Sequence, residues 1–323
     1  WTSDAIQAAL KGAVGTSLFH LALIGSAAAA LASALALLAD AFYFRGFTRT
    51  QTASARVIRS RRLSYRFFRF LPGTVRALTV KEVKTFLRDQ TQWTQLFLIA
   101  ALLVIYIYNF EALPLDKSPI QTVYLQNVFA FLNMGLALFV LTAVAARFAY
   151  PAVSLEREAF WLVKSSPLSI RRFLLIKFFI YYLPLLALTE TLIVGTNLLL
   201  KVTPFMMALS TVTVFFLVPG IVALAIGFGA AYPDFKAENP AQTATSVGGL
   251  VFMLTCAVYI GGVILLQAGP VYRLFMADLH GRPLSAAIWF WSLAAFGAAF
   301  VLSILAIVLP LRFGERRLDR MHL

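Results

Sequence analysis

The sequence contains few of the residues on which soluble and secreted proteins depend. A single cysteine in 323 residues excludes a framework of disulfide bonds, and charged residues make up only 13% of the chain. Acidic residues are the scarcest charged class, with 14 aspartates and glutamates against 28 lysines and arginines. Hydrophobic residues, by contrast, make up 60% of the chain, and the mean hydropathy is +0.81. This composition predicts an integral membrane protein.

Sequence motifs of several enzyme classes are also absent. The chain has no GxxxxGK[ST] phosphate-binding loop, no GxSxG nucleophile motif and no HExxH zinc motif. The three histidines, His20, His280 and His322, are far apart in the sequence, so no metal site is predicted. We therefore expect that the chain is not an enzyme and holds no metal or cofactor of its own.

Long apolar runs dominate what is present. A helix needs about 20 apolar residues to cross a bilayer core of about 30 Å. The runs that meet this length are 17–43, 93–112, 123–147, 172–200, 204–231, 247–267 and 285–311. They are continuous and show no alternation, which predicts helices rather than barrel strands. We expect an all-α polytopic membrane protein with about seven transmembrane helices.

The distribution of lysine and arginine predicts how these helices are oriented. Of the 28 basic residues, 23 lie in 45–92, 147–177, 232–246 and the C-terminal tail, which are alternate connections. By the positive-inside rule these connections face the cytoplasm of an inner membrane, with Trp1 outside and the C-terminus inside. Because an external N-terminus is unusual without a signal peptide, we expect that an N-terminal portion of the protein precedes Trp1. The same bias explains the net charge of +14, so no nucleic-acid partner is expected.

The runs divide the chain into three parts. Residues 1–44 are expected to be one transmembrane helix that ends a preceding half, and 45–74 to be a basic cytoplasmic linker. Residues 75–323 are expected to form a six-helix domain. Its first segment, 75–90, has an apolar arc beside a basic one and predicts an interfacial helix. The expected interfacial anchors are Lys81, Lys84, Phe86 and Arg88, and anionic lipid headgroups are the expected partner along 45–90.

The segment SLEREAFWLVKSSP at 154–167 is unusually aromatic for a short polar connection. Ser154 is expected to cap a cytoplasmic helix over 154–166, and Ser166 followed by Pro167 to begin the next helix. The neighbouring Phe160 and Trp161 suit either docking to a partner protein or anchoring at the membrane interface.

Four polar residues lie inside the predicted spans: Asn133, Glu190, Thr196 and Asn197. Such residues either form hydrogen bonds between helices or line a substrate path. Both alternatives remain open for each of them.

Three stretches resemble the permease subunits of bacterial ABC transporters of the type-2 exporter class. They are KEVKTFLRDQTQWTQLFL at 81–98, LEREAFWLVKSSPLSIRRFLLIKF at 155–178 and PDFKAENPAQTATSVGGL at 233–250. The resemblance covers about 75–323 and implies a coupling helix at 154–166. The residues that it implies for coupling to an ATPase are Glu156, Arg157, Glu158, Phe160 and Trp161.

The function implied by the resemblance is a transmembrane permease subunit that exports a hydrophobic or amphipathic substrate. Its implied partners are a cytosolic ABC ATPase, expected as a dimer that holds ATP and Mg²⁺, and a fused or second permease half. Two alternatives come from the residues themselves. One is a proton-coupled secondary transporter that uses Glu190, and the other is a membrane assembly or sensory subunit without transport.

Overall fold

A computed structural model describes residues 1–52, 68–111, 122–236, 240–280 and 285–321. The chain divides into two compact units, Trp1–Phe70 and Leu71–Leu323. Among the described residues, seven helices are long and apolar enough to cross a membrane, and no strand is present. The predicted all-α polytopic fold is therefore confirmed.

The first unit is a helical hairpin of α1 (Thr2–Leu10) and α2 (Val14–Thr52). Gly12 turns the chain between them with a φ of 75°, and the Ser17 hydroxyl donates a hydrogen bond to the carbonyl of Ala5 at 2.9 Å. Most of the large apolar side chains between Val14 and Leu38 are exposed, as expected for a helix whose solvent is lipid. Because α2 continues to Thr52, the linker expected from residue 45 begins as helix; residues 53–67 lie outside the described part.

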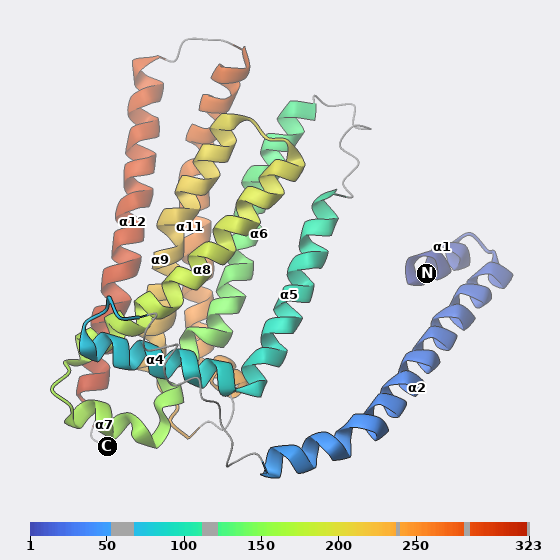
Figure 1. Ribbon diagram of the computed structural model, residues 1–323. Coiled ribbons are helices and arrows are strands. Elements are labelled where there is room, and N and C mark those ends of the chain that lie inside the picture. The colour runs from blue at the N-terminus through green and yellow to red at the C-terminus, as the bar shows by residue number, and fades with distance from the viewer. Residues whose placement is uncertain (53–67, 112–121, 237–239, 281–284, 322–323) are drawn as a thin grey trace. The chain divides into compact units, whose positions relative to one another are not determined.

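The second unit is a bundle of long helices with short helices at one end (Figure 1). Its elements, in chain order, are α4 (Gly73–Arg88), α5 (Gln90–Glu111), α6 (Thr122–Phe148), η3 (Tyr150–Ala152), η4 (Ser154–Ala159), α7 (Phe160–Ser165), α8 (Ile170–Leu200), α9 (Pro204–Ala231), α10 (Pro240–Ala244), α11 (Val247–His280) and α12 (Ala286–Asp319).

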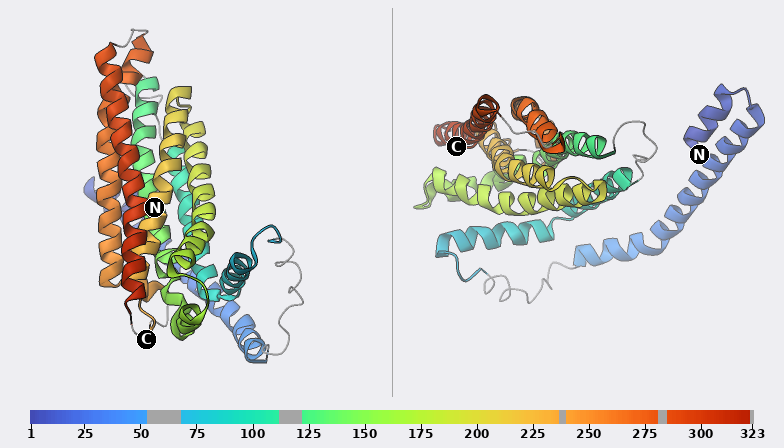
Figure 2. Two further views of the ribbon diagram at one scale, coloured as in Figure 1. Left: turned by 90° about the vertical axis from the view of Figure 1, so that its left-hand side faces the viewer. Right: turned by 90° about the horizontal axis from the view of Figure 1, so that it is seen from above.

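Helix α9 is the centre of this bundle and lies between α8 and α12 (Figure 2). Its residues from Leu217 to Ile226 are almost all buried, which explains why its sequence is apolar on every side. The hairpin to α8 is fixed by Asn127, whose side-chain oxygen accepts hydrogen bonds from the backbone and hydroxyl of Thr203, at 3.2 and 2.8 Å. Thr203 in turn caps α9. Polar side chains therefore set where the buried helix begins.

Candidate functional site

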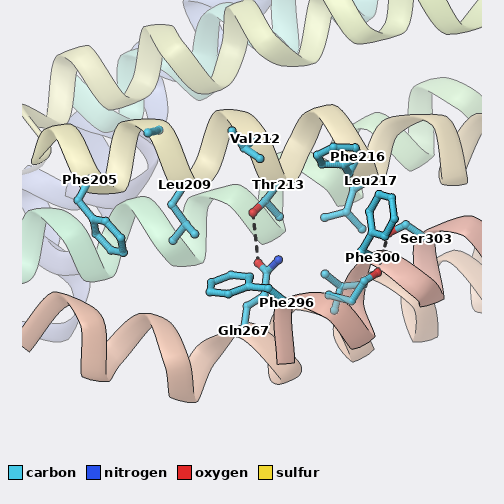
Figure 3. Close-up of a pocket in the computed structure, with 13 residues that line it drawn as sticks. Phe205, Leu209, Val212, Thr213, Phe216, Leu217, Gln267, Phe296, Phe300 and Ser303 are labelled. Carbon is cyan, nitrogen blue, oxygen red and sulfur yellow. Dashed lines mark hydrogen bonds between the residues drawn. The ribbon is translucent and has the colours of Figure 1, made fainter. Parts of the chain in front are cut away.

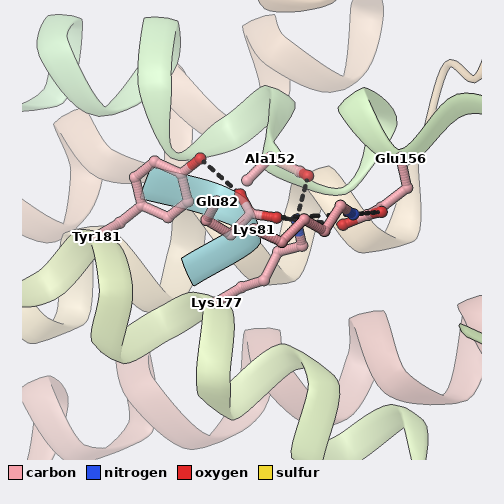
Figure 4. Close-up of polar contacts among 6 residues, drawn as sticks. All are labelled: Lys81, Glu82, Ala152, Glu156, Lys177 and Tyr181. Carbon is pink, nitrogen blue, oxygen red and sulfur yellow. Dashed lines mark hydrogen bonds and ion pairs between the residues drawn. The ribbon is translucent and has the colours of Figure 1, made fainter. Parts of the chain in front are cut away.

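The most unusual feature of the second unit is a lysine inside its core. Lys177 lies on α8, two turns after the N-cap residue Ser169, and its side chain is only 2% exposed. Its Nζ atom lies 2.8 Å from Glu82 Oε1, 2.7 Å from Glu156 Oε1 and 2.8 Å from the carbonyl oxygen of Ala152 (Figure 4). The contacts to Glu82 and Ala152 are hydrogen bonds and the contact to Glu156 is an ion pair, so three oxygen atoms surround the ammonium group.

Two further side chains complete this ion cluster. Lys81 on α4 pairs with the second carboxylate oxygen of Glu156, and Tyr181, one turn after Lys177, donates to Glu82 at 3.5 Å (Figure 4). Two ammonium groups thus face two carboxylates, and the ion cluster has no net charge. Burying a charge is tolerated when it is paired and hydrogen-bonded in this way.

The ion cluster joins three elements that are distant in the sequence. Glu82 and Lys81 come from α4, Glu156 comes from η4, and Lys177 comes from α8. Pro151 lies in the 3₁₀ turn η3 after α6, and this turn brings the carbonyl of Ala152 to Lys177. A movement of η4 or α4 would therefore act directly on a membrane-spanning helix.

Arg157 interrupts the connection directly after Glu156. Its backbone adopts φ 49° and ψ −140°, a conformation that suits glycine, so it carries strain. The predicted helix over 154–166 is for this reason wrong in detail: Arg157 kinks the 3₁₀ helix η4, which ends at Ala159, and a separate helix α7 begins at Phe160. Ser154 does not cap it; its hydroxyl accepts a hydrogen bond from the backbone of Asp234 at 3.0 Å.

The two aromatic residues of α7 have opposite surroundings. Phe160 is fully buried, with its ring centroid 5.1 Å from that of Phe235 and 6.1 Å from that of Phe173. Trp161 is 58% exposed, and the adjacent Leu162 is also exposed. Docking to a partner and anchoring at the membrane interface both need an exposed ring, so neither expected role fits Phe160, whose ring belongs to the core.

The other residues expected to couple to an ATPase also differ in their surroundings. Glu156 is part of the ion cluster, and Arg157 is exposed at the kink. The side chain of Glu158 lies outside the described part of the structure. The following span begins at Ser169, whose hydroxyl accepts from Arg172 N at 3.4 Å, and not at Ser166 as the sequence predicted. Ser166 instead donates back to Val163 at 2.7 Å.

The expected interfacial anchors have different environments along α4. Lys81 belongs to the ion cluster, Lys84 is half-buried and Arg88 is exposed. The ring of Phe86 packs against Trp93 and Phe148, at centroid distances of 6.1 and 6.2 Å. Helix α4 is thus fixed to the bundle by a charged contact and an aromatic one.

The polar residues inside the spans connect helices with one another. Asn133 on α6 donates to the Thr196 hydroxyl on α8 at 2.8 Å and accepts from Tyr106 on α5. Asn197 donates to Ser210 on α9 at 2.7 Å.

Glu190 differs from these residues. Neither of its carboxylate oxygens has a hydrogen-bond partner in the described chain. The structure therefore joins Asn133 to Thr196 by a hydrogen bond, whereas Glu190 forms none with either residue.

Sequence reasoning missed Glu82, Lys177 and Tyr181. The available signal was Lys177, which interrupts the apolar run from 172 to 200. An ionisable residue in such a run indicates a functional site, but its place near the end of the run also suits a headgroup anchor. The described residues include no group of three or more histidine, cysteine or acidic side chains that could hold a metal ion.

Comparison with known proteins identifies a family. A family model described as "Putative ATP-binding cassette" matches residues 1–323. No curated protein and no solved structure matches the chain.

This match contradicts three predictions made from the sequence: that the chain is a permease subunit of the type-2 exporter class, that it exports a substrate with the energy of a separate ATPase, and that it is not an enzyme. The matched family is described by ATP binding rather than by permease activity. Those predictions relied on the arrangement of the helices and on the local amino-acid sequence of the loops. Neither of these identifies the residues that perform chemistry at a site. Because the match covers every residue, the chain belongs to this ATP-binding cassette family.

Proposed function

We propose that this chain is a membrane-embedded ATP-binding cassette transporter protein, and that its ion cluster and α7 form the site where nucleotide-driven movement reaches the membrane helices. The observation that carries the proposal is the buried triad of Glu82, Glu156 and Lys177. Through Glu156 and Lys177 it connects η4, the segment directly before α7, to the span α8. The family supports the involvement of ATP, and the seven apolar helices support a membrane location.

The geometry explains how such movement would be transmitted. Phe160 holds α7 in the core, while Trp161 and Leu162 on the same short helix are exposed. A force on the exposed face would be passed through the strained backbone at Arg157 to Glu156, and from there to Lys177. A buried ion pair is suited to this role because it has few alternative arrangements.

We propose that Trp161 and Leu162, which are exposed, contact a cytosolic protein partner, and that ATP and Mg²⁺ are the cofactors of the assembled system. Tryptophan is enriched among residues that dominate binding energy, particularly beside other apolar contacts. The charge bias supports a cytoplasmic position for α7 in an inner membrane. We propose two further partners: anionic lipid headgroups along 45–90, and a second or fused half of the transporter. Residues 53–67 of the first contact lie outside the described part of the structure.

The proposal is tested by ATP hydrolysis. The tagged full-length chain is purified from its own cell membranes into lipid nanodiscs, and the ATPase rate and bound proteins are measured. Trp161→Ala is expected to lower the ATPase rate and the amount of bound partner about ten-fold, since loss of a central aromatic contact costs about 1–2 kcal/mol or more.

Trp289 provides a matched control, because it is also 58% exposed but lies on α12 at the opposite end of the bundle. Trp289→Ala is expected to behave as the unmodified protein. A wild-type preparation without ATPase activity would refute the proposal. So would a Trp161→Ala protein that hydrolyses ATP and retains its partner as the unmodified chain does.

A further inference from the structure

A pocket lies between α9, α11 and α12, outside the elements that form the ion cluster. Its volume is about 420 Å³, and its walls are mostly apolar. Phe205 and Phe216 come from α9, and Phe296 and Phe300 come from α12 (Figure 3). The size and the aromatic walls are typical of sites that bind small molecules.

One amide interrupts this apolar wall. Gln267 on α11 is only 5% exposed, and Figure 3 shows its side chain facing α9, with the oxygen toward the Thr213 hydroxyl. That hydroxyl donates to Gln267 Oε1 at 3.4 Å. Among the described residues the Gln267 amide nitrogen has no acceptor, so its hydrogens are available to a molecule in the pocket. A buried donor in an apolar site is costly unless something accepts from it.

The chemistry of the walls limits what can bind. None of the residues that line the pocket is charged. All of them belong to helices that are long and apolar enough to span a membrane, so charged molecules are excluded by the cost of removing their hydration. The aromatic rings favour a flat or flexible apolar body, and Gln267 requires an oxygen that accepts a hydrogen bond.

We propose that this pocket binds an uncharged amphipathic molecule, with its apolar body against the four phenylalanines and a carbonyl or ester oxygen on the Gln267 amide. A membrane lipid ester and a small apolar molecule dissolved in the bilayer share this chemistry. The site does not depend on the proposed role of the ion cluster, because α9, α11 and α12 contribute no residue to that cluster.

Benzophenone is a suitable probe because it is uncharged, has two phenyl rings and one carbonyl oxygen, and crosslinks under ultraviolet light. The full-length protein in phosphatidylcholine nanodiscs is labelled over a range of benzophenone concentrations, and the labelled peptides are identified by mass spectrometry. Saturable labelling is expected within 205–217, 263–267 and 296–303. Gln267→Met keeps a long unbranched side chain but removes the donor, and it is expected to raise the half-saturating concentration about five-fold.

Two variants control for folding and for nonspecific partition. Leu265→Met, at an exposed position two residues away on α11, is expected to leave the labelling unchanged. Ala208→Phe adds a ring at an exposed position on the pocket wall, and it is expected to abolish saturable labelling without disturbing the core.

Lipid extracted from the purified proteins separates the two sources. Neutral lipid that is retained by the unmodified protein and lost from Gln267→Met identifies a lipid ester. If benzophenone labelling depends on Gln267 but no neutral lipid is retained, the natural ligand is a small apolar molecule and not a lipid ester. Labelling that rises linearly across all spans, or a Gln267→Met protein that saturates at the same concentration as the unmodified protein, would overturn the proposal.

Discussion

Lys177 shows how a single buried charge can be held inside a membrane protein. Its ammonium group loses its water but gains three oxygen acceptors, two of them carboxylates. Removing one partner from such an arrangement leaves an uncompensated buried charge, whereas removing one charge of each sign does not. The ion cluster should therefore respond differently to single and paired substitutions.

Lys177→Met is expected to lower the free energy of unfolding by about 3–5 kcal/mol, because Glu82 and Glu156 then share only Lys81. Thermal unfolding in detergent, followed by helical circular dichroism, measures the change. The double variant Lys177→Met with Glu156→Gln leaves one ammonium and one carboxylate, so it is expected to be more stable than Lys177→Met alone. A double variant whose loss equals the sum of both single losses would contradict electrostatic coupling within the ion cluster.

At the scale of elements, the contact between α9 and α12 depends on glycine. A Cβ atom built on Gly314 would lie 2.5 Å from the carbonyl oxygen of Gly227, and one built on Gly227 would lie 2.4 Å from the carbonyl carbon of Pro310. Backbone atoms are in contact here, as is usual where small residues let membrane helices approach closely. The two helices cannot accept a side chain at this crossing without moving apart.

Gly314→Ala is accordingly expected to destabilise the protein by about 1–3 kcal/mol through overpacking. Gly297 lies on the same helix, and a Cβ atom built on it would meet no neighbouring atom within 4 Å. Gly297→Ala is thus expected to be neutral or stabilising by up to about 1 kcal/mol, because alanine favours helix. Unfolding midpoints of the two variants measure this, and equal midpoints would show that the crossing tolerates a methyl group.

The elements also show what the sequence can and cannot predict. The seven spans were predicted because each is a local run of about 20 apolar residues, and α4 was predicted because its polar and apolar residues repeat at helical spacing. The ion cluster was not, because Glu82 and Lys177 are 95 residues apart and meet only through tertiary packing. The helix over 154–166 failed at Arg157, whose backbone conformation no propensity for arginine indicates.

At the scale of the whole molecule, the proposed orientation determines which end of the second unit meets the cytoplasm. Lys164 on α7 donates to the carbonyl of Met321, so α7 and the end of α12 are at the same end of the bundle. Helix α12 has 34 residues and is therefore about 50 Å long, which places its start at Ala286 near the other membrane surface. The excess of basic residues supports a cytoplasmic position for the α7 end.

Cysteine labelling tests this orientation directly. Cys256 is fully buried, so the unmodified protein is expected to stay unlabelled by a membrane-impermeant maleimide. Ser165→Cys and Ala286→Cys place one exposed thiol at each end of the bundle. In intact cells Ala286→Cys is expected to be labelled, and Ser165→Cys only after the membrane is permeabilised. The reverse pattern would place α7 outside, where neither ATP nor a cytosolic partner could act on the ion cluster.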